Sequence, residues 1–207
     1  MKEVTDPQIQ FTSGCPNACQ YCHEPKEIKV FSPKIPDQKH IDILDMNLLA
    51  NPNVMQILKS LPKKKYNLVC GVDFRRLTPD ICKLLKEKGF QKIRWAWDYN
   101  FGQQRIQKKT YKMLLNAGFR KDQLMVFILG NWKIPYIDCI RKTYLLLSWN
   151  VEISPCIYDG GTPKNHNDWL SKRFDNKRFW EYEEVKRFVK HCRKFNHITN
   201  FGIDVEW

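Results

Sequence analysis

Strand-like and helix-like segments alternate along almost all of this chain, and this alternation restricts the fold more than any other feature of the sequence. When a helix joins each strand to the next, the strands pair in parallel and the helices cover the outside of the sheet. We therefore predict an α/β fold with a parallel sheet and outer helices. Six segments have the pattern of strands: residues 8–13, 40–45, 66–74, 92–98, 123–129 and 151–158.

Five segments between and after these strands have the spacing of amphipathic helices: residues 51–61, 78–89, 104–116, 134–147 and 180–194. Thr78-Pro79 is a typical helix start, and Gly89 is a typical helix end. We expect a proline-rich connector over residues 25–36 and a short final strand over residues 198–206. A length of 207 residues suits a single domain over residues 1–207, with residues 165–207 as a candidate small C-terminal extension.

The chain is strongly basic, with a formal net charge of +13 and a pI of about 9.4. This charge favours an anionic partner, either a nucleic acid or an acidic protein, although many basic runs only form a solvated surface. No apolar run approaches the roughly 18 residues of a membrane span. The N-terminus does not have the pattern of a signal peptide, and eight cysteines without a paired framework suit a reducing compartment. We therefore expect a cytoplasmic protein that does not enter a membrane.

Three cysteines, Cys15, Cys19 and Cys22, follow the first predicted strand with the spacing C-x3-C-x2-C. Three thiolates on one short loop can hold three corners of a cubane iron–sulfur cluster. The fourth iron then stays open to a ligand that the protein does not supply. The spacing thus predicts a reactive cluster rather than a purely structural one.

Three other interpretations of these cysteines are open. A structural zinc site needs four ligands, and the fourth could only be His23 or a distant cysteine. Residues 19–23 also read C-x-x-C-H, a haem attachment motif, but this leaves Cys15 unexplained and requires export from the cytosol. A disulfide framework is the weakest alternative, because a chain of this length can build a core without cross-links.

Polar residues follow the predicted strands at the ends where parallel α/β enzymes place their functional groups. This rule gives a set of candidates that does not depend on any family: residues 45–47, 73–76, 97–100, 130–132 and 156–161, which include Asp45, Asn47, Asp73, Arg75, Asp98 and Asn131. The alternative is that they are ordinary turn residues, since Asp and Asn favour turns.

Cys15, Cys19, Tyr21 and Cys22 match the pattern C-x3-C-x-aromatic-C, and the chain resembles the radical SAM superfamily at these residues. The resemblance implies a partial (β/α)6 TIM-like barrel. It implies a [4Fe-4S] cluster on the three cysteines, with S-adenosyl-L-methionine chelated to the fourth iron. The reaction would be reductive cleavage of this cofactor to a 5′-deoxyadenosyl radical that abstracts hydrogen from an unidentified substrate. A flavodoxin or ferredoxin would supply the electron.

The resemblance also implies roles for the candidate cofactor-binding residues. Tyr21 would lie beside the adenine, and Asp98 would face the ribose hydroxyls. Asp45 and Asn47 stand where the family commonly has a Gly-Gly-Glu segment, and their oxygens could accept from the cofactor ammonium. Arg75, or its neighbour Arg76, would meet the cofactor carboxylate. Asn131 belongs to what remains of the glycine-rich segment after the fifth strand.

Two functions compete with this one. The chain could be a non-catalytic iron–sulfur or zinc module that binds nucleic acid through its basic surface. It could also be a degenerate family member that binds the cofactor without turnover, because the Gly-Gly-Glu pattern is missing.

Overall fold

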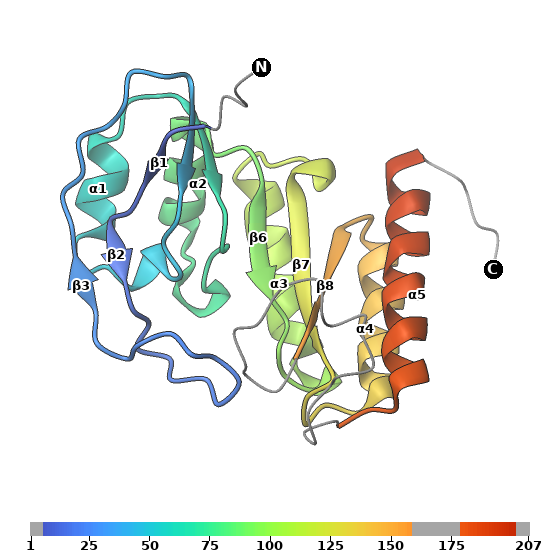
Figure 1. Cartoon of the computed structure of the whole chain (residues 1–207). Coiled ribbons are helices and arrows are strands. Elements are labelled where there is room, and N and C mark those ends of the chain that lie inside the picture. The colour runs from blue at the N-terminus through green and yellow to red at the C-terminus, as the bar shows by residue number, and fades with distance from the viewer. Residues whose placement is uncertain (1–5, 159–178, 202–207) are drawn as a thin grey trace, which may run out of the picture. The chain divides into compact units, whose positions relative to one another are not determined.

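The computed structural model describes residues 6–158 and 179–201 (Figure 1). The chain forms two compact units that interleave along the sequence. The first comprises Met1–Cys19, Glu24–Trp95 and Gln107–Leu124, and the second comprises Gln20–His23, Ala96–Ile106 and Met125–Trp207. Each unit is described separately below.

The first unit contains a parallel sheet in the order β1 (Gln8–Ile9), β4 (His40–Ile43), β5 (Lys65–Leu68). Ile41 and Ile43 of β4 are buried, and so are Tyr66 and Leu68 of β5. Alternate residues of a strand point to the same face, so each strand places one apolar row in the core. The helices of this unit are α1 (Val54–Ser60), α2 (Pro79–Lys88) and most of α3 (Gln104–Asn116).

Helix α2 shows how the sequence sets the bounds of an element. The Thr78 hydroxyl accepts from the Ile81 backbone N–H at 3.2 Å, and Pro79 occupies the first helical position. Gly89 ends the helix with a φ of 94°, a conformation that costs glycine little. The predicted start and end of this helix are confirmed.

A short antiparallel ribbon, β2 (Thr12–Ser13) with β3 (Lys29–Val30), precedes and follows the cysteine loop. The predicted first strand over residues 8–13 is therefore divided, because β1 pairs with β4 while β2 pairs with β3. The predicted connector over residues 25–36 contains β3. Gly14 follows the ribbon with a φ of 81°, and a Cβ there would lie 1.9 Å from the Glu27 carbonyl oxygen, so only glycine fits.

In the second unit, β7 (Leu124–Gly130) pairs in parallel with β8 (Glu152–Ile157). The chain enters this unit at the last residue of β6 (Ile93–Ala96), and the next residue, Trp97, donates its backbone N–H to the Phe127 carbonyl at 2.8 Å. Helices α4 (Tyr136–Ser148) and α5 (Tyr182–Phe201) lie side by side and both pack against β8 (Figure 1).

The remaining described elements are 3-10 turns: η1 (Leu48–Ala50), η2 (Phe74–Arg76), η3 (Phe101–Gln103) and η4 (Lys121–Gln123). Turn η2 corrects the prediction of a strand over residues 66–74, because β5 ends at Leu68 and the Asp73 side chain caps the turn by accepting from the Arg75 N–H. The predicted final strand is wrong over residues 198–201, where α5 continues. Residues 202–206 lie outside the described residues.

The mixed α/β class, the parallel pairing and the outer helices are as predicted. Within the described ranges, no helix is long and apolar enough to cross a membrane.

Candidate functional site

The cysteine loop begins in the first unit on a backbone that is held at both sides. The Cys15 N–H donates to the Pro25 carbonyl at 2.7 Å, and the Gly14 N–H donates to the Glu24 carboxylate at 2.8 Å. These bonds join the two ends of residues 14–25. Cys15 itself is partly buried.

Asn47 lies directly beside Cys15. It follows β4 and is only 2% exposed. Its Nδ2 lies 3.3 Å from the Cys15 Sγ and 3.4 Å from Asp73 Oδ2, donating to both. Its Oδ1 is buried and accepts no hydrogen bond from the residues that the structure describes. An amide with both hydrogens used and its oxygen unused can accept one further hydrogen bond through that oxygen.

Asp45 presents a second unused acceptor at the same end of β4. Its side chain is 0% exposed, and Oδ2 accepts from the Phe11 N–H at 2.9 Å. Its Oδ1, like that of Asn47, has no hydrogen-bond partner in the described part of the chain. Burial raises the pKa of Asp45 from 3.8 to about 6, although hydrogen bonds from Phe11 and Thr12 act against it. Two buried acceptor oxygens, two residues apart in the sequence, thus lack a donor among the described residues.

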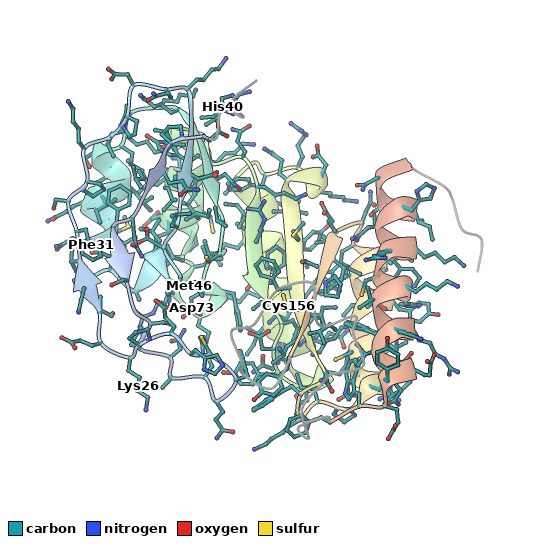
Figure 2. The ribbon with its side chains drawn as sticks, viewed as in Figure 1. Lys26, Phe31, His40, Met46, Asp73 and Cys156 are labelled. Carbon is teal, nitrogen blue, oxygen red and sulfur yellow. The ribbon has the colours of Figure 1, made fainter. Side chains whose placement is uncertain are left out.

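Asp73, labelled in Figure 2, links the cysteine loop to η2. Its carboxylate accepts from Asn17, which lies between Cys15 and Cys19, at 2.9 Å, and from Arg75 Nε at 2.7 Å. Burial alone would raise the pKa of Asp73, but the hydrogen bonds from Arg75 and Asn17 outweigh it and hold the pKa below its ordinary value. The sequence placed Asp73 among the residues at the strand ends but gave it no specific role. Its position after the third strand was a signal, but its partner lies 56 residues away.

Arg75 was predicted to bind the cofactor carboxylate. In the structure its guanidinium pairs with Asp73, and its side chain is partly exposed. Arg76 lies farther from the same carboxylate, at 3.7 Å. Asp73, which also accepts from Asn17 of the cysteine loop, therefore keeps Arg75 near this loop. Part of the Arg75 side chain is exposed to solvent.

In the second unit, the structure brings together two of the predicted residues. The Tyr21 hydroxyl donates to Asp98 Oδ2 at 2.6 Å. Tyr21 also meets Trp132 edge to face, with ring centroids 5.8 Å apart. Trp132 in turn contacts Tyr158 at 4.5 Å and Phe179 at 5.0 Å between centroids. Tyr21, Trp132, Tyr158 and Phe179 thus form a group of four aromatic rings. Tyr21 lies at the edge of this group, with Asp98 bonded to it.

Asn131 has a structural position that the sequence did not reveal. It is buried with a φ of 54°, its Nδ2 donates to the Tyr158 carbonyl at 2.7 Å, and its Oδ1 accepts from the backbone N–H groups of Phe179 and Trp180 at 3.1 Å each. The side chain predicted to meet the cofactor therefore joins the end of β7 to the segment before α5.

Lys142 is a residue that sequence reasoning missed. It is fully buried in α4, where Nζ donates to the Trp97 carbonyl at 3.0 Å and lies 5.6 Å from the centre of the Trp97 ring. Burial lowers the pKa of Lys142, and the nearby Cys139 and Asp98 act in the opposite direction. A buried lysine is rare, and its sequence neighbours gave no sign of it.

Cys15 and Cys19 are partly buried in the first unit, and Cys22 is exposed in the second. Among the described residues, no group of three or more His, Cys, Asp or Glu side chains is arranged to hold a metal ion. The sequence matches no model of a known protein family and no curated protein. The family resemblance therefore rests on the residues of this chain.

Proposed function

We propose that this chain is a radical SAM enzyme with Cys15, Cys19 and Cys22 as the ligands of a [4Fe-4S] cluster. The observation that carries the proposal is the pair of unsatisfied buried oxygens that follow β4, Asp45 Oδ1 and Asn47 Oδ1, together with the hydrogen bond from the Asn47 amide to Cys15. A buried acceptor without a partner costs about 1–3 kcal/mol, so such groups need an explanation. The ammonium of S-adenosyl-L-methionine has three N–H donors, the kind of group that such oxygens accept from.

When bound, the cluster and S-adenosyl-L-methionine supply the reaction itself, a one-electron cleavage that yields methionine and a 5′-deoxyadenosyl radical able to take hydrogen from a substrate. The protein supplies ligation and orientation. The Asn47 amide would stabilise the Cys15 thiolate by donating to it. Asp73 would hold the loop through Asn17. A partial (β/α)6 barrel is the finer fold that we propose with this function.

Tyr21 and Asp98 would orient the nucleoside. Tyr21 has an aromatic face for the adenine, and Asp98 has a carboxylate that could accept from the ribose hydroxyls. Their mutual hydrogen bond of 2.6 Å fixes both side chains. Arg75 would act on the cofactor carboxylate through its charge, while Asp73 keeps the guanidinium in position. The buried Asn131 would support this region through the backbone.

A non-catalytic iron–sulfur or zinc module that binds nucleic acid is the second candidate. The net charge of +13 favours it, together with Lys133 beside the Trp132 ring at 5.5 Å. Aromatic rings and lysines are the usual means of holding single-stranded nucleic acid. This candidate gives no role to the two unsatisfied oxygens, so we rank it second.

The test is anaerobic reconstitution with iron and sulfide, followed by reduction with dithionite and mass spectrometry of 5′-deoxyadenosine. We expect about four iron and four sulfide per chain and production of 5′-deoxyadenosine. The changes Cys15→Ala, Cys19→Ala and Cys22→Ala should each abolish both, and Cys70→Ala serves as the matched control. Cofactor cleavage that survives loss of any of the three cysteines would refute the assignment. Zinc at one equivalent without iron would favour the second candidate.

Asn47 gives a separate test of the cofactor position. Loss of a hydrogen bond to a charged group costs about 1.5–3 kcal/mol, so Asn47→Ala should weaken binding of S-adenosyl-L-methionine roughly 10- to 100-fold. Asn47→Asp keeps the acceptor oxygens and should bind at least as tightly as Asn47→Ala. Isothermal titration calorimetry of the cluster-loaded protein measures both, with the exposed Asn53→Ala as control. Equal affinities for the parent and Asn47→Ala would remove this oxygen from the site.

A further inference from the structure

Four aromatic rings of the second unit gather at the ends of its parallel strands. Trp132 follows the end of β7, and Tyr158 follows the end of β8. The other two rings are Tyr21 of the cysteine loop and Phe179, which precedes α5. The carboxyl ends of neighbouring parallel strands meet at one edge of a sheet, and α/β sheets bind their ligands at this edge (Figure 1). We name Tyr21, Trp132, Tyr158 and Phe179 the aromatic group.

The aromatic group does not belong to the buried core. Phe179 is 44% exposed, and the other three rings are partly exposed. Trp132 differs in this respect from the four other tryptophans that the structure describes, which are at most 6% exposed. Packing in the core therefore does not explain these rings, and part of their surface is open to a ligand.

A buried amide fixes the backbone that carries three of the four rings. Asn131 precedes Trp132, its Nδ2 donates to the Tyr158 carbonyl at 2.7 Å, and its Oδ1 accepts from the Phe179 N–H at 3.1 Å. Asn131 is 1% exposed and has a φ of 54°, a left-handed conformation that costs energy and is often found at functional sites. The rings are thus held in place by hydrogen bonds although they are partly exposed. A fixed group of open rings binds a ligand without first having to be ordered.

The charges at the aromatic group disfavour a cationic ligand. Lys133 is exposed, its Nζ lies 5.5 Å from the centre of the Trp132 ring, and it donates to Gln20 Oε1 at 3.5 Å. The acidic side chain that contacts the group is Asp98, which accepts from the Tyr21 hydroxyl at 2.6 Å. Aromatic cages bind methylated ammonium groups, but a lysine already lies at these rings and the whole chain carries +13. The ligand should therefore be flat, and neutral or anionic.

We propose that the aromatic group binds bases of a single-stranded nucleic acid, and that a nucleotide of this strand is the substrate. The inference rests on the proposed function and names its substrate class. Bases have flat faces that stack on aromatic rings, and the phosphates beside them carry the negative charge that Lys133 attracts. In the reaction, a C–H bond of the nucleotide breaks and its hydrogen atom passes to the 5′-deoxyadenosyl radical. This gives 5′-deoxyadenosine and leaves the unpaired electron on the nucleotide.

The arrangement of the rings provides for a base besides the cofactor adenine. Tyr21 is the ring proposed above for the adenine, and Trp132 links it to the other two rings. The ring centroids lie 5.8 Å apart for Trp132 with Tyr21, 4.5 Å with Tyr158 and 5.0 Å with Phe179. A base stacked on this part of the group would lie close to the cofactor nucleoside, as hydrogen transfer requires. A duplex keeps its bases stacked inside, so the strand has to present them unpaired.

The first test measures binding to the chain without a cluster, so it does not depend on the proposed reaction. The probe is a fluorescein-labelled single-stranded RNA of mixed sequence, about 12 nucleotides long, and the readout is fluorescence anisotropy. Loss of one stacking ring should raise the Kd at least about fivefold in Phe179→Ala. The matched control is Tyr144→Ala, which removes a ring of the same 44% exposure from α4 and should leave the Kd unchanged.

Three further measurements separate stacking from charge. Trp132→Phe keeps a flat ring and should raise the Kd less than Trp132→Ala does. Inorganic polyphosphate has the charge of the strand without its bases, so Phe179→Ala should bind it as tightly as the parent does. Lys133→Gln should reduce the slope of log Kd against log salt concentration by about 0.7, the contribution of one phosphate contact with a single strand.

The second test addresses the substrate, with the cluster-loaded chain, dithionite and S-adenosyl-L-methionine. The RNA should accelerate formation of 5′-deoxyadenosine. At RNA concentrations below the Kd, this acceleration should be at least about fivefold smaller in Phe179→Ala. RNA binding without any 5′-deoxyadenosine in the parent would contradict the proposed function, while the effect of Phe179→Ala on the Kd would still support the aromatic group as a nucleic-acid site.

Three results would overturn the inference. One is an absent or equal Kd for the RNA in the parent, Phe179→Ala and Tyr144→Ala, which would mean that the rings only pack against one another. Another is displacement of the RNA by saturating S-adenosyl-L-methionine, which would assign all four rings to the cofactor. The third is a rate of 5′-deoxyadenosine formation that the RNA does not change, which would separate the bound strand from the reaction.

Discussion

Asp45 carries the clearest pH dependence of any single residue at the candidate site. Its pKa is raised from 3.8 to about 6 by burial. In the unfolded chain the carboxyl loses its proton first, so the contribution of Asp45 to stability is complete below pH 3.8 and is lost as the pH rises through about 6. In neutral solution, the buried and ionised Asp45 carboxylate therefore lowers the stability of the protein without cofactor.

The change Asp45→Asn should remove this dependence, because an amide of the same shape can still accept from the Phe11 N–H. Relative to the parent, its free energy of unfolding should rise by about 2 kcal/mol between pH 4.5 and pH 7. Urea unfolding at the two pH values measures this difference, with the exposed Asp37→Asn as the control for loss of one charge. A difference that stays constant with pH would mean that Asp45 titrates normally.

At the scale of elements, Asn131 joins β7, β8 and the segment before α5 through three side-chain hydrogen bonds. Asn150, after α4, has nearly the same φ of 55° but lies exposed. Substitutions at these two residues therefore separate two contributions to the free energy of unfolding, the cost of the backbone conformation and the cost of lost hydrogen bonds. Comparing them shows how much the buried Asn131 amide stabilises this part of the second unit.

We expect Asn131→Ala to lower the free energy of unfolding by about 3 kcal/mol or more, because it leaves buried backbone groups without partners. Asn150→Ala should lower it by only about 1–2 kcal/mol, the cost of a left-handed conformation. Glycine at either position should recover that conformational part. Urea unfolding of the four variants measures these values, and equal losses for the two alanine variants would contradict the role of the Asn131 side chain.

The elements that the sequence predicted best are those defined by local patterns. Helix α3 has the predicted bounds, and α2 has the predicted capping residues. The division of residues 8–13 into β1 and β2 could not be predicted, since the alternation is the same whether a strand has one partner or two. The sequence also could not show the contact of Asn17 with Asp73 or the burial of Lys142, because both depend on residues distant in the chain.

At the scale of the whole molecule, the interleaving of the two units suggests how the chain unfolds. Residues 96–106 of the second unit are inserted between Trp95 and Gln107 of the first. If one unit unfolded alone, its inserted segments would become loops that remain tied to folded chain at both ends, and their closure costs entropy. The expectation of a single domain remains a prediction that unfolding can test.

We expect the two units to unfold in one transition. Tryptophan fluorescence and far-UV circular dichroism should give the same urea midpoint, as two-state unfolding requires. A Trp95→Phe variant retains Trp97, Trp132, Trp149, Trp180 and the remaining tryptophans. In this variant, the urea midpoint from fluorescence should equal the urea midpoint from far-UV circular dichroism. Two separated midpoints would show that the units are independent domains.

The interleaving also affects the order in which the chain can fold during synthesis. The backbone passes between the units five times, the last time between Leu124 and Met125. The first unit therefore stays incomplete until its third segment, Gln107–Leu124, has left the ribosome, although β1, β4 and β5 emerge much earlier. Slow or interrupted translation before residue 124 would leave the first unit without its third segment, and the incomplete unit would depend on chaperones until that segment arrived.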